Sequence, residues 1–245
     1  MEGISAAMRK VIISGASSDI GLAVCRRFLE DDYIIVAHFN SGRPELEELA
    51  TNWPDRVRLV GCDFSEPDAV DRLCKEHPAE IDGADILINA AAIYEPLAFM
   101  DLTADAILAG ITANLLPGLL LMKQCVPGML ERGFGRIVHL SSIGVKFQGG
   151  SNSFVYSLTK HALEFLPADH KKWAAHNVFV NSIRVGLTDT RFHNHNPSKN
   201  MADRIALVPA GRMASPEEIA RQIYWLGSPE NSFTTGQTIS VSGGE

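Results

Sequence analysis

The 245-residue chain lacks the features that mark disulfide-bonded, metal-binding or nucleic-acid-binding proteins. Its four cysteines, at positions 25, 62, 74 and 125, are far apart and form neither a zinc-type spacing nor a CxxC pair, so we expect reduced core thiols. A formal net charge of -7 offers no basic surface to phosphate backbones, which argues against nucleic acid as a partner.

The sequence also lacks a segment that would direct it into or across a membrane. Residues 1–10 contain no apolar run of the signal-peptide type, and no stretch approaches the roughly 18 apolar residues that span a bilayer. We therefore expect a soluble, cytoplasmic protein without a membrane partner. The 46% hydrophobic content is ample for a buried core, and the length favours one domain.

Short β-branched runs alternate with helical stretches along the whole chain. We expect strands at 10–14, 33–39, 57–62, 84–88, 135–140, 178–184 and 238–241. This alternation is typical of a parallel sheet with helices on both faces. The sequence therefore predicts a single α/β domain over residues 1–245, with a polar segment at about 187–209 that we interpret as a lid.

A glycine turn, Gly15-Ala-Ser-Ser-Asp-Ile-Gly21, joins the first strand to the first helix. Glycines let backbone amides approach a pyrophosphate, and a helix N-terminus presents free N–H groups and a positive dipole to it. The turn therefore predicts a dinucleotide cradle formed by Gly15, Ser17, Ser18, Asp19, Ile20 and Gly21. The alternative is a turn whose glycines serve packing only.

The second strand ends where the ribose of an adenosine would lie, and no acidic residue ends it. An Asp or Glu there would hold the 2′-hydroxyl of NAD and repel a 2′-phosphate. Asn40, Ser41 and Arg43 therefore favour NADP over NAD. Alternatively, Arg43 is a solvated turn residue.

The third and fourth strands end in residues that we place beside the adenine. Asp63, followed by Phe64, could accept a hydrogen bond from the adenine amino group, or it could cap a helix over 65–75. Asn89, Ala90 and Ala91 follow the fourth strand, and the two alanines would let a cofactor lie against the backbone.

Tyr156 and Lys160 are four residues apart in a predicted helix, so they lie on one face. An adjacent cation favours the phenolate and is expected to lower the pKa of Tyr156, so the pair can pass a proton to or from a substrate oxygen. A chance spacing is the alternative for the pair alone. Ser142, at the end of the fifth strand, and Asn114, where a helix over 102–130 is interrupted, are further candidates.

These residues together resemble the short-chain dehydrogenase/reductase family in its classical, single-domain form, which includes 3-oxoacyl-ACP reductases. The resemblance covers nearly the whole chain and implies a Rossmann-type doubly wound parallel sheet of about seven strands. It is carried by Ser14-Gly15-x3-Asp19-x-Gly21, Asp63, Asn89-Ala-Ala-Ala, Asn114, Ser142, Tyr156-x3-Lys160, Thr235-Gly236-Gln237 and Val241-Ser-Gly-Gly244.

The resemblance also implies the roles of the site residues. Tyr156 would be the general acid or base, and Ser142 would hydrogen-bond the substrate oxygen. Lys160 would lower the tyrosine pKa and hold the nicotinamide ribose, and Asn114 would bind a water that relays protons. At the nicotinamide end, the cofactor would be held by Gly186, Thr188 and Thr190.

Several positions depart from the family pattern. Asp19 replaces a glycine, and we expect its side chain to cap the helix and turn away from the pyrophosphate. The loop between the serine and Tyr156 is one residue longer than expected, so Ser141 could replace Ser142. Pro167 is expected to kink the helix that carries Lys160. In the family this helix and the one bearing Asn114 form a dimer contact, which implies a homodimer or homotetramer.

The leading hypothesis is an NAD(P)-dependent oxidoreductase that acts on a carbonyl or secondary alcohol of a small molecule. The lid over 191–204 is rich in Asn, His, Lys and Arg, which favours a polar metabolite. A 3-oxoacyl-ACP reductase activity and a non-catalytic NADP-binding sensor or scaffold are the alternatives. His193 and His195 could suggest a metal, but no third ligand is evident, so we predict no metal and assign them to the lid.

Overall fold

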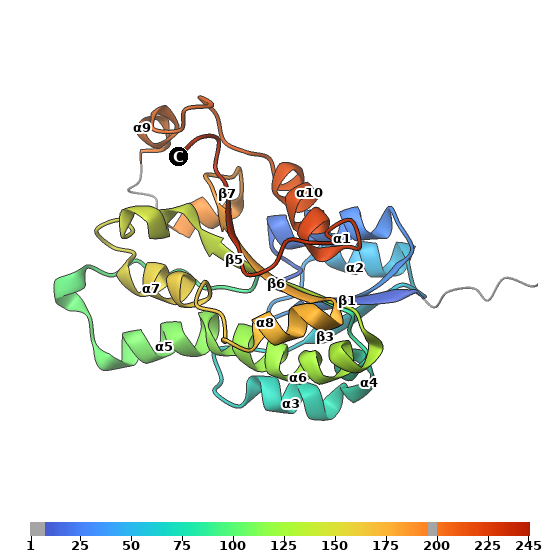
Figure 1. Cartoon of the computed structure of the whole chain (residues 1–245). Coiled ribbons are helices and arrows are strands. Elements are labelled where there is room, and N and C mark those ends of the chain that lie inside the picture. The colour runs from blue at the N-terminus through green and yellow to red at the C-terminus, as the bar shows by residue number, and fades with distance from the viewer. Residues whose placement is uncertain (1–7, 196–199) are drawn as a thin grey trace, which may run out of the picture.

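Seven parallel strands form a single sheet in the order β3-β2-β1-β4-β5-β6-β7 (Figure 1). The computed structural model describes residues 8–195 and 200–245. The strands are β1 (Arg9–Ser14), β2 (Tyr33–Phe39), β3 (Val57–Gly61), β4 (Ile86–Asn89), β5 (Gly135–Ser142), β6 (Val178–Val185) and β7 (Thr238–Val241). The strand order reverses between β1 and β4, and ligands bind such sheets in the crevice at the carboxyl ends of the strands there. The predicted doubly wound sheet is confirmed.

Helices cover both faces of the sheet. One face carries α1 (Asp19–Leu29), α2 (Pro44–Asn52) and α10 (Pro216–Gly227), and the other carries α3 (Ala69–Glu76), α4 (Pro78–Asp82), α6 (Leu116–Arg132) and α8 (His170–Trp173). On the second side, α5 (Ala104–Asn114) leads into α6, and α7 (Phe154–Ala162) packs on α5. The short 3-10 helices are η1 (Phe99–Asp101), η2 (Ile143–Phe147), η3 (Ala174–His176) and η4 (Arg191–His195). The predicted lid contains η4 and α9 (Met201–Ala206), and residues 196–199 lie outside the described part.

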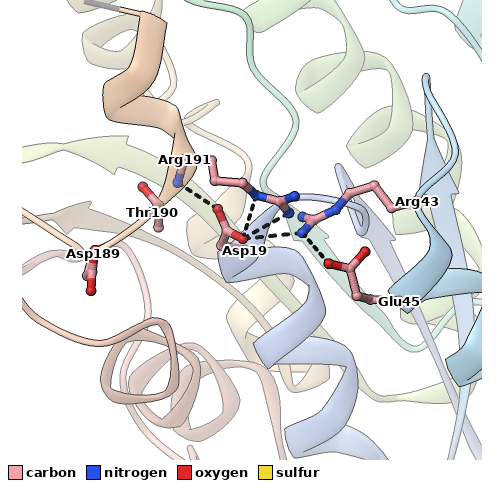
Figure 2. A pocket seen from close by; sticks show the side chains of 6 residues that line it. All are labelled: Asp19, Arg43, Glu45, Asp189, Thr190 and Arg191. Carbon is pink, nitrogen blue, oxygen red and sulfur yellow. Dashed lines mark hydrogen bonds and ion pairs between the residues drawn. The ribbon is translucent and has the colours of Figure 1, made fainter. Parts of the chain in front are cut away.

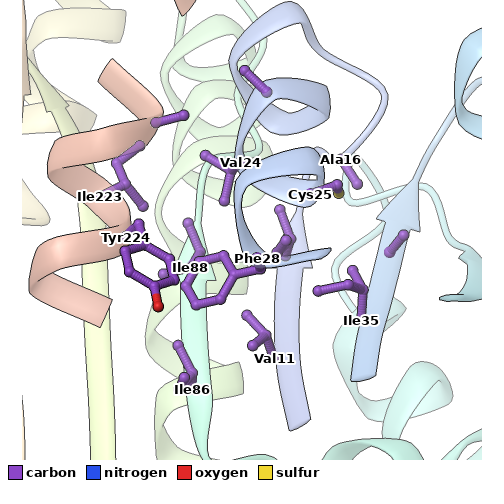
Figure 3. Close-up of a cluster of buried hydrophobic side chains, with 14 of the residues drawn as sticks. Val11, Ala16, Val24, Cys25, Phe28, Ile35, Ile86, Ile88, Ile223 and Tyr224 are labelled. Atoms are coloured by element: carbon purple, nitrogen blue, oxygen red, sulfur yellow. The ribbon is translucent and has the colours of Figure 1, made fainter. Parts of the chain in front are cut away.

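The central strands are apolar on both faces. In β1, Val11 and Ile13 belong to the core under α1 and α10, whereas Ile12 belongs to the core under α6. Figure 3 shows the first core, where Phe28 of α1 meets Tyr224 of α10 with ring centroids 5.0 Å apart. Burial of each such side chain contributes about 1.5–3 kcal/mol. The tightly packed core therefore fixes the positions of the strand ends.

The apolar segment over 104–132 forms two helices with a break at Leu115, in agreement with the predicted interruption. By length and composition this segment is apolar enough to cross a membrane, so the expectation that no such stretch exists was wrong. Gly, Asn and Pro residues interrupt the apolar residues of this segment, so the sequence shows no long unbroken apolar run. In the fold, α6 buries Leu121, Cys125 and Met129 against the sheet, as a core helix does.

Two helix boundaries differ from the predictions. The helix expected over 65–75 begins at Ala69, because Ser65 and the residues after it form a turn. The helix with Tyr156 and Lys160 ends at Ala162, and the chain becomes helical again only at His170. Pro167 therefore lies in a break rather than at a kink, since proline lacks an N–H and disfavours helical backbone in the residue before it.

Candidate active site

The turn after β1 places glycines where a side chain would not fit. Gly15 has a φ of +69°, and a Cβ there would lie 2.8 Å from the Cα of Ala91. A Cβ on Gly21 would lie 2.3 Å from the carbonyl oxygen of Gly15. The turn is therefore packed closely against both α1 and the end of β4, which leaves its backbone as the surface of the crevice.

A buried serine joins the ends of β1 and β4. The Ser14 hydroxyl donates to Oδ1 of Asn89 at 3.0 Å and accepts hydrogen bonds from the N–H groups of Ala90 and Ala91, both at 3.1 Å. Asn89 is 1% exposed, and its Nδ2 also contacts Nδ1 of His139 at 3.2 Å. Asn89 therefore supports the crevice from below, while Ala90 and Ala91 are partly accessible.

His38, which the sequence analysis did not single out, connects the ends of three strands. Its Nδ1 accepts a hydrogen bond from the N–H of Gly15 at 3.2 Å, and its Nε2 donates to the carbonyl of Cys62 at 2.9 Å. Burial lowers the pKa of His38 to about 4, so the ring is neutral. The Phe64 ring is buried and stacked on His38 at 3.8 Å, so only the backbone of Phe64 is left for a cofactor.

Asp19 is not the cap that the sequence analysis expected. Ser18 is the N-cap of α1, and its hydroxyl accepts a hydrogen bond from the N–H of Gly21 at 3.0 Å. The Asp19 carboxylate instead lies between Arg43 and Arg191, the first residue of η4 (Figure 2). The side chain therefore does turn away from the turn backbone, but it does so toward two cations.

Arg43, the predicted 2′-phosphate cation, is largely buried rather than solvated. It donates to the carbonyl oxygen of Ser17, and its Nη2 lies 3.4 Å from Asp19 and 3.2 Å from Glu45. Its Nε is buried without a hydrogen-bond partner among the described residues. Arg43 thus brings a cation with unused donor capacity to the end of the crevice that the sequence predicts to bind the ribose.

The exposed carboxylate of Asp63 lies near the same end. It accepts a hydrogen bond from the N–H of Ser65 at 2.9 Å, and that bond lowers the pKa of the carboxyl group. The Asn40 side chain is a further partner of Asp63, while Ser41 is exposed. The helix-cap alternative for Asp63 was wrong, because the N-cap position of α3 is occupied by Asp68, five residues later.

Tyr156 and Ser142 are neighbours at the carboxyl end of β5, where the Ser142 hydroxyl group favours the phenolate and so acts to lower the pKa of Tyr156. The Ser142 hydroxyl also accepts a bond from the N–H of Gly144 at 3.2 Å. Surrounding protein raises the pKa of Tyr156 and outweighs the opposite effect of Ser142, although part of the ring remains accessible. Tyr156 is therefore a protonated phenol at neutral pH.

Lys160 does not bring the pKa of Tyr156 below its usual value, contrary to the expectation, because burial of the phenol dominates. Its Nζ lies 5.8 Å from the centre of the Tyr156 ring and donates to the carbonyl of Leu140 at 2.8 Å. Complete burial lowers the pKa of Lys160 to about 8. The ammonium group is thus held behind the phenol and is close to losing its proton near neutral pH.

The buried Asn114 sits at the break between α5 and α6. Its Oδ1 accepts from the N–H of Ile93 at 2.7 Å, and its Nδ2 donates to the Ile93 carbonyl at 3.1 Å and to the Thr159 hydroxyl at 3.3 Å. One turn earlier, a Cβ on Gly110 would lie only 2.3 Å from Cγ1 of Val155. Asn114 and Gly110 together fix how closely α5 approaches the helix that carries Tyr156.

The structure separates the two candidate serines. Ser141 donates to Oε1 of Glu164 at 2.6 Å, and Glu164 forms a two-bond ion pair with Arg184 at 2.8 and 2.6 Å. Ser142 alone contacts Tyr156. This geometry favours Ser142 as the serine that meets a substrate.

The residues predicted at the nicotinamide end follow β6. A Cβ on Gly186 would lie 2.4 Å from the Cα of Ser242, and the buried Thr188 donates to the carbonyl of Gly186 at 3.0 Å. Thr190 contacts the carbonyl of Thr188 at 3.4 Å, and Nε2 of His193 contacts the same carbonyl at 2.9 Å. His193 thus stabilises the start of the lid. The His195 side chain lies outside the described residues, and the described ones contain no cluster of three metal-ligating side chains.

Two aromatic residues that the sequence analysis missed lie against Tyr156. The ring centroids of Tyr94 and Phe192 are 5.5 and 5.6 Å from that of Tyr156 and 5.5 Å from each other. Phe192 comes from the lid that was expected to be polar. Nothing local in the sequence signals this contact, because the three residues lie in different segments of the chain.

A small cavity of about 120 Å³ adjoins Tyr156. Its walls come from the segment after β4, from α5 and from α7, and they are mostly apolar, with Glu95 and Asn114 as the polar exceptions. The lining residues are Ile93, Glu95, Pro96, Leu97, Ala106, Gly110, Asn114, Val155 and Tyr156. A larger cavity of about 470 Å³ lies at the other end of the crevice, around Asp19, Arg43 and Arg191 (Figure 2).

Comparison with known proteins identifies the family. A family model described as Enoyl-(Acyl carrier protein) reductase, a branch of the short-chain dehydrogenases/reductases, matches residues 15–245. The chain belongs to the short-chain dehydrogenase/reductase family. It is therefore an NAD(P)-dependent oxidoreductase, as the sequence predicted.

Individual relatives agree with this assignment. An acetoacetyl-CoA reductase of Cupriavidus necator is 31% identical, with 96% of this chain and 97% of the relative covered. A solved structure described as a betaketoacyl-ACP reductase is 30% identical with a TM-score of 0.81, and 96% and 97% of the two chains are covered. Another, described as an NAD(P)-dependent gluconate 5-dehydrogenase of Beutenbergia cavernae with NADP at low occupancy, is 27% identical with a TM-score of 0.86, covering 96% and 95%.

The residues present fit the nicotinamide cofactor of this family. The glycine turn exposes backbone beside the helix N-terminus, and the buried Nε of Arg43 is a donor without a partner in the described part of the chain. The cavity of about 470 Å³ lies beside both features. The donor set is therefore suited to the phosphates of a dinucleotide.

Proposed function

We propose that this chain reduces the ketone group of a small metabolite with NADPH, and that Tyr156 donates the proton. The observation that carries the proposal is that Ser142 and Tyr156 are neighbours at the mouth of the crevice, with Lys160 buried beside them. The bound cofactor would supply the hydride to the carbonyl carbon. The two hydroxyl groups would hold the carbonyl oxygen and orient it.

The protonation state of Tyr156 supports reduction rather than oxidation. Because the surrounding protein raises its pKa, the phenol carries a proton at neutral pH and can give it to the developing alkoxide. Lys160, with a pKa near 8, would stabilise the phenolate that remains. Asn114 would act by holding the backbone of Ile93 beside the substrate cavity.

The cavity beside Tyr156 supports a short acyl group on the substrate. A cavity of 150 Å³ accepts a benzene molecule, so about 120 Å³ accommodates a chain of roughly four carbons. Its mostly apolar wall suits an acyl chain better than a polyhydroxylated one. A short 3-oxoacyl thioester, such as the substrate named for the acetoacetyl-CoA reductase relative, is therefore the favoured candidate. The polar lid favours the second candidate, a sugar-acid ketone of the gluconate 5-dehydrogenase type.

The ribose end supports NADP as the preferred cofactor. No carboxylate ends β2, and Arg43 is held at this end by the Ser17 carbonyl. A 2′-phosphate would compete with Glu45 for the guanidinium group and would offer the stronger charge. Asn40 and Ser41 would leave room for it.

Exposed apolar side chains on α5 and α7 support assembly into a homodimer or homotetramer. Leu108 of α5 is 58% exposed, and Phe154 and Leu158 of α7 are 38% and 43% exposed. These side chains lie on two helices that pack on each other, and exposed apolar side chains gathered in this way mark interfaces between proteins. We expect Leu108→Glu to lower the mass measured by light scattering; an unchanged mass would argue against this surface.

The proposal is tested by measuring turnover and binding on the same preparation. We expect NADPH oxidation with acetoacetyl-CoA to be faster than with 5-ketogluconate, and both to be lost in Tyr156→Phe. Faster turnover of 5-ketogluconate would reverse the order of the two substrate candidates. Tight NADPH binding without turnover of any ketone would instead favour the non-catalytic sensor or scaffold.

A further inference from the structure

Asp19 and Arg191 connect the two sides of the crevice, although they are 172 residues apart in the chain. The N–H of Arg191 donates to Oδ2 of Asp19 at 2.9 Å, and the Nε and Nη2 atoms donate to Oδ1 at 3.2 and 3.0 Å. Figure 2 shows Arg191 reaching from the lid to the first residue of α1. Three donors of one residue therefore hold one carboxylate, which fixes the guanidinium plane.

The other edge of that guanidinium group is not engaged by any described residue. Nη1 of Arg191 has no hydrogen-bond partner in the described ranges 8–195 and 200–245, and the side chain is 55% exposed. Arg43 contacts the same carboxylate oxygen, Oδ1, so two guanidinium groups border one cavity of about 470 Å³ (Figure 2). Planar donors in such a pair suit phosphate oxygens.

We propose that Arg191 is a cofactor-binding residue for the diphosphate of the dinucleotide, and that Asp19 positions it. This inference rests on the proposed function, because it needs a dinucleotide in the crevice. It explains how a carboxylate is tolerated beside a diphosphate, since Arg191 neutralises Asp19 and presents its free edge to the phosphate oxygens. It also gives the two arginines different roles. Arg191 binds the diphosphate that NAD and NADP share, and Arg43 binds the 2′-phosphate of NADP.

Two consequences distinguish this role from that of a surface ion pair. Arg191→Ala should weaken NADPH and NADH to the same extent, by about tenfold each, as expected for loss of a hydrogen bond to a charged group. In that variant Asp19 keeps only the longer contact of 3.4 Å with Arg43, so its negative charge beside the phosphates is less compensated. Adding Asp19→Asn should therefore restore part of the affinity, by about threefold, because the repulsion is removed.

The experiment is fluorescence titration of NADPH and NADH into the full-length protein, its Arg191→Ala, Arg191→Lys and Asp19→Asn variants, and the double variant. Arg212→Ala is the matched control, because Arg212 also forms a two-bond pair with a carboxylate, that of Glu218, but does not line the cavity. The cofactor affinity of Arg191→Lys should lie between those of the wild type and Arg191→Ala, since lysine keeps the positive charge but lacks the planar set of N–H donors. Melting temperatures confirm that each variant is folded.

The outcomes separate the inference from the proposed function. Wild-type protein that binds neither cofactor overturns both. Wild-type binding with Arg191→Ala indistinguishable from Arg212→Ala overturns the role of Arg191 only. A double variant weaker than Arg191→Ala overturns the role given to Asp19, and a loss confined to NADPH would move Arg191 to the 2′-phosphate and overturn its assignment to the diphosphate.

Discussion

His38 and Gly15 are joined by a hydrogen bond of 3.2 Å from a backbone N–H of the glycine turn to a buried imidazole nitrogen. The bond requires Nδ1 without a proton, since the same ring donates from Nε2 to the carbonyl of Cys62. A second buried histidine, His139, contacts Asn89 through its Nδ1. Both rings must stay neutral in the folded protein. We therefore expect low pH to destabilise the fold around the crevice by protonating them.

We expect stability to fall as the pH decreases from about 6.5 toward 4. Burial lowers the pKa of His38 and His139 from 6.5 to about 4 each, so the unfolded chain takes up these protons first. The stabilisation is complete above pH 6.5 and is lost toward pH 4, by up to about 3 kcal/mol per histidine. Urea unfolding at pH 7.5, 6.0 and 5.0 measures it.

The control is the double variant His38→Gln, His139→Asn, which should lose most of this dependence between pH 7.5 and 5.0. The carboxyl groups with lowered pKa, such as Glu164, contribute only below that window. An unfolding free energy of the wild type that is equal at pH 7.5 and 5.0 would contradict the role of the two rings.

Tyr156→Phe should lower kcat by about 10²- to 10⁴-fold, the usual contribution of a general acid. NADPH affinity should stay within about twofold, because the ring remains. Steady-state kinetics and titration on the same preparation separate the two effects. Tyr33→Phe removes a hydroxyl from the first residue of β2, at the other end of the sheet, and should leave kcat unchanged. Equal kcat in wild type and Tyr156→Phe would refute the assignment.

Ser142→Ala and Ser141→Ala should give opposite phenotypes. The first should lower kcat/KM by about 10- to 100-fold with little change in melting temperature, because it removes one hydrogen bond to the carbonyl oxygen in the transition state. The second should keep kcat/KM and lower stability by about 1 kcal/mol, since Glu164 loses the bond from Ser141. The reverse pattern would make Ser141 the participating serine.

Arg43→Ala should weaken the binding of NADPH by about tenfold and the binding of NADH much less, because only NADPH has the 2′-phosphate. Glu45→Gln should have the opposite sign and tighten NADPH, since it frees the guanidinium group from a competing carboxylate. Parallel titrations with both cofactors test this. Equal weakening of NADPH and NADH in Arg43→Ala would place the preference elsewhere.

The sequence predicted those parts of the fold that depend on neighbouring residues. The strand before Gly15, the turn itself and the helix with Tyr156 and Lys160 follow from β-branched runs, glycines and four-residue spacing. The boundaries that failed had competing local signals: Asp63 and Asp68 can both precede a helix, and Pro167 can either kink or end one.

The site was less predictable wherever a side chain depends on a distant partner. Asp19 looks like a helix cap from its neighbours, and only the folded chain brings Arg191 to it. The pKa of Tyr156 was expected to fall because Lys160 is close in sequence, but burial and the direction of the ammonium group determine the outcome. His38 and Phe192 were missed for the same reason.

Gly110 of α5 has no side chain, and this absence allows the neighbouring helix that carries Tyr156 to pack closely. A single methyl group there would meet Val155, the residue before Tyr156, at 2.3 Å. Gly110→Ala would press on α7 near its N-terminal end and change the alignment of the Tyr156 and Ser142 hydroxyl groups without altering either residue. A substitution at this one glycine therefore changes the rate by moving α7, although Gly110 itself does not take part in the reaction.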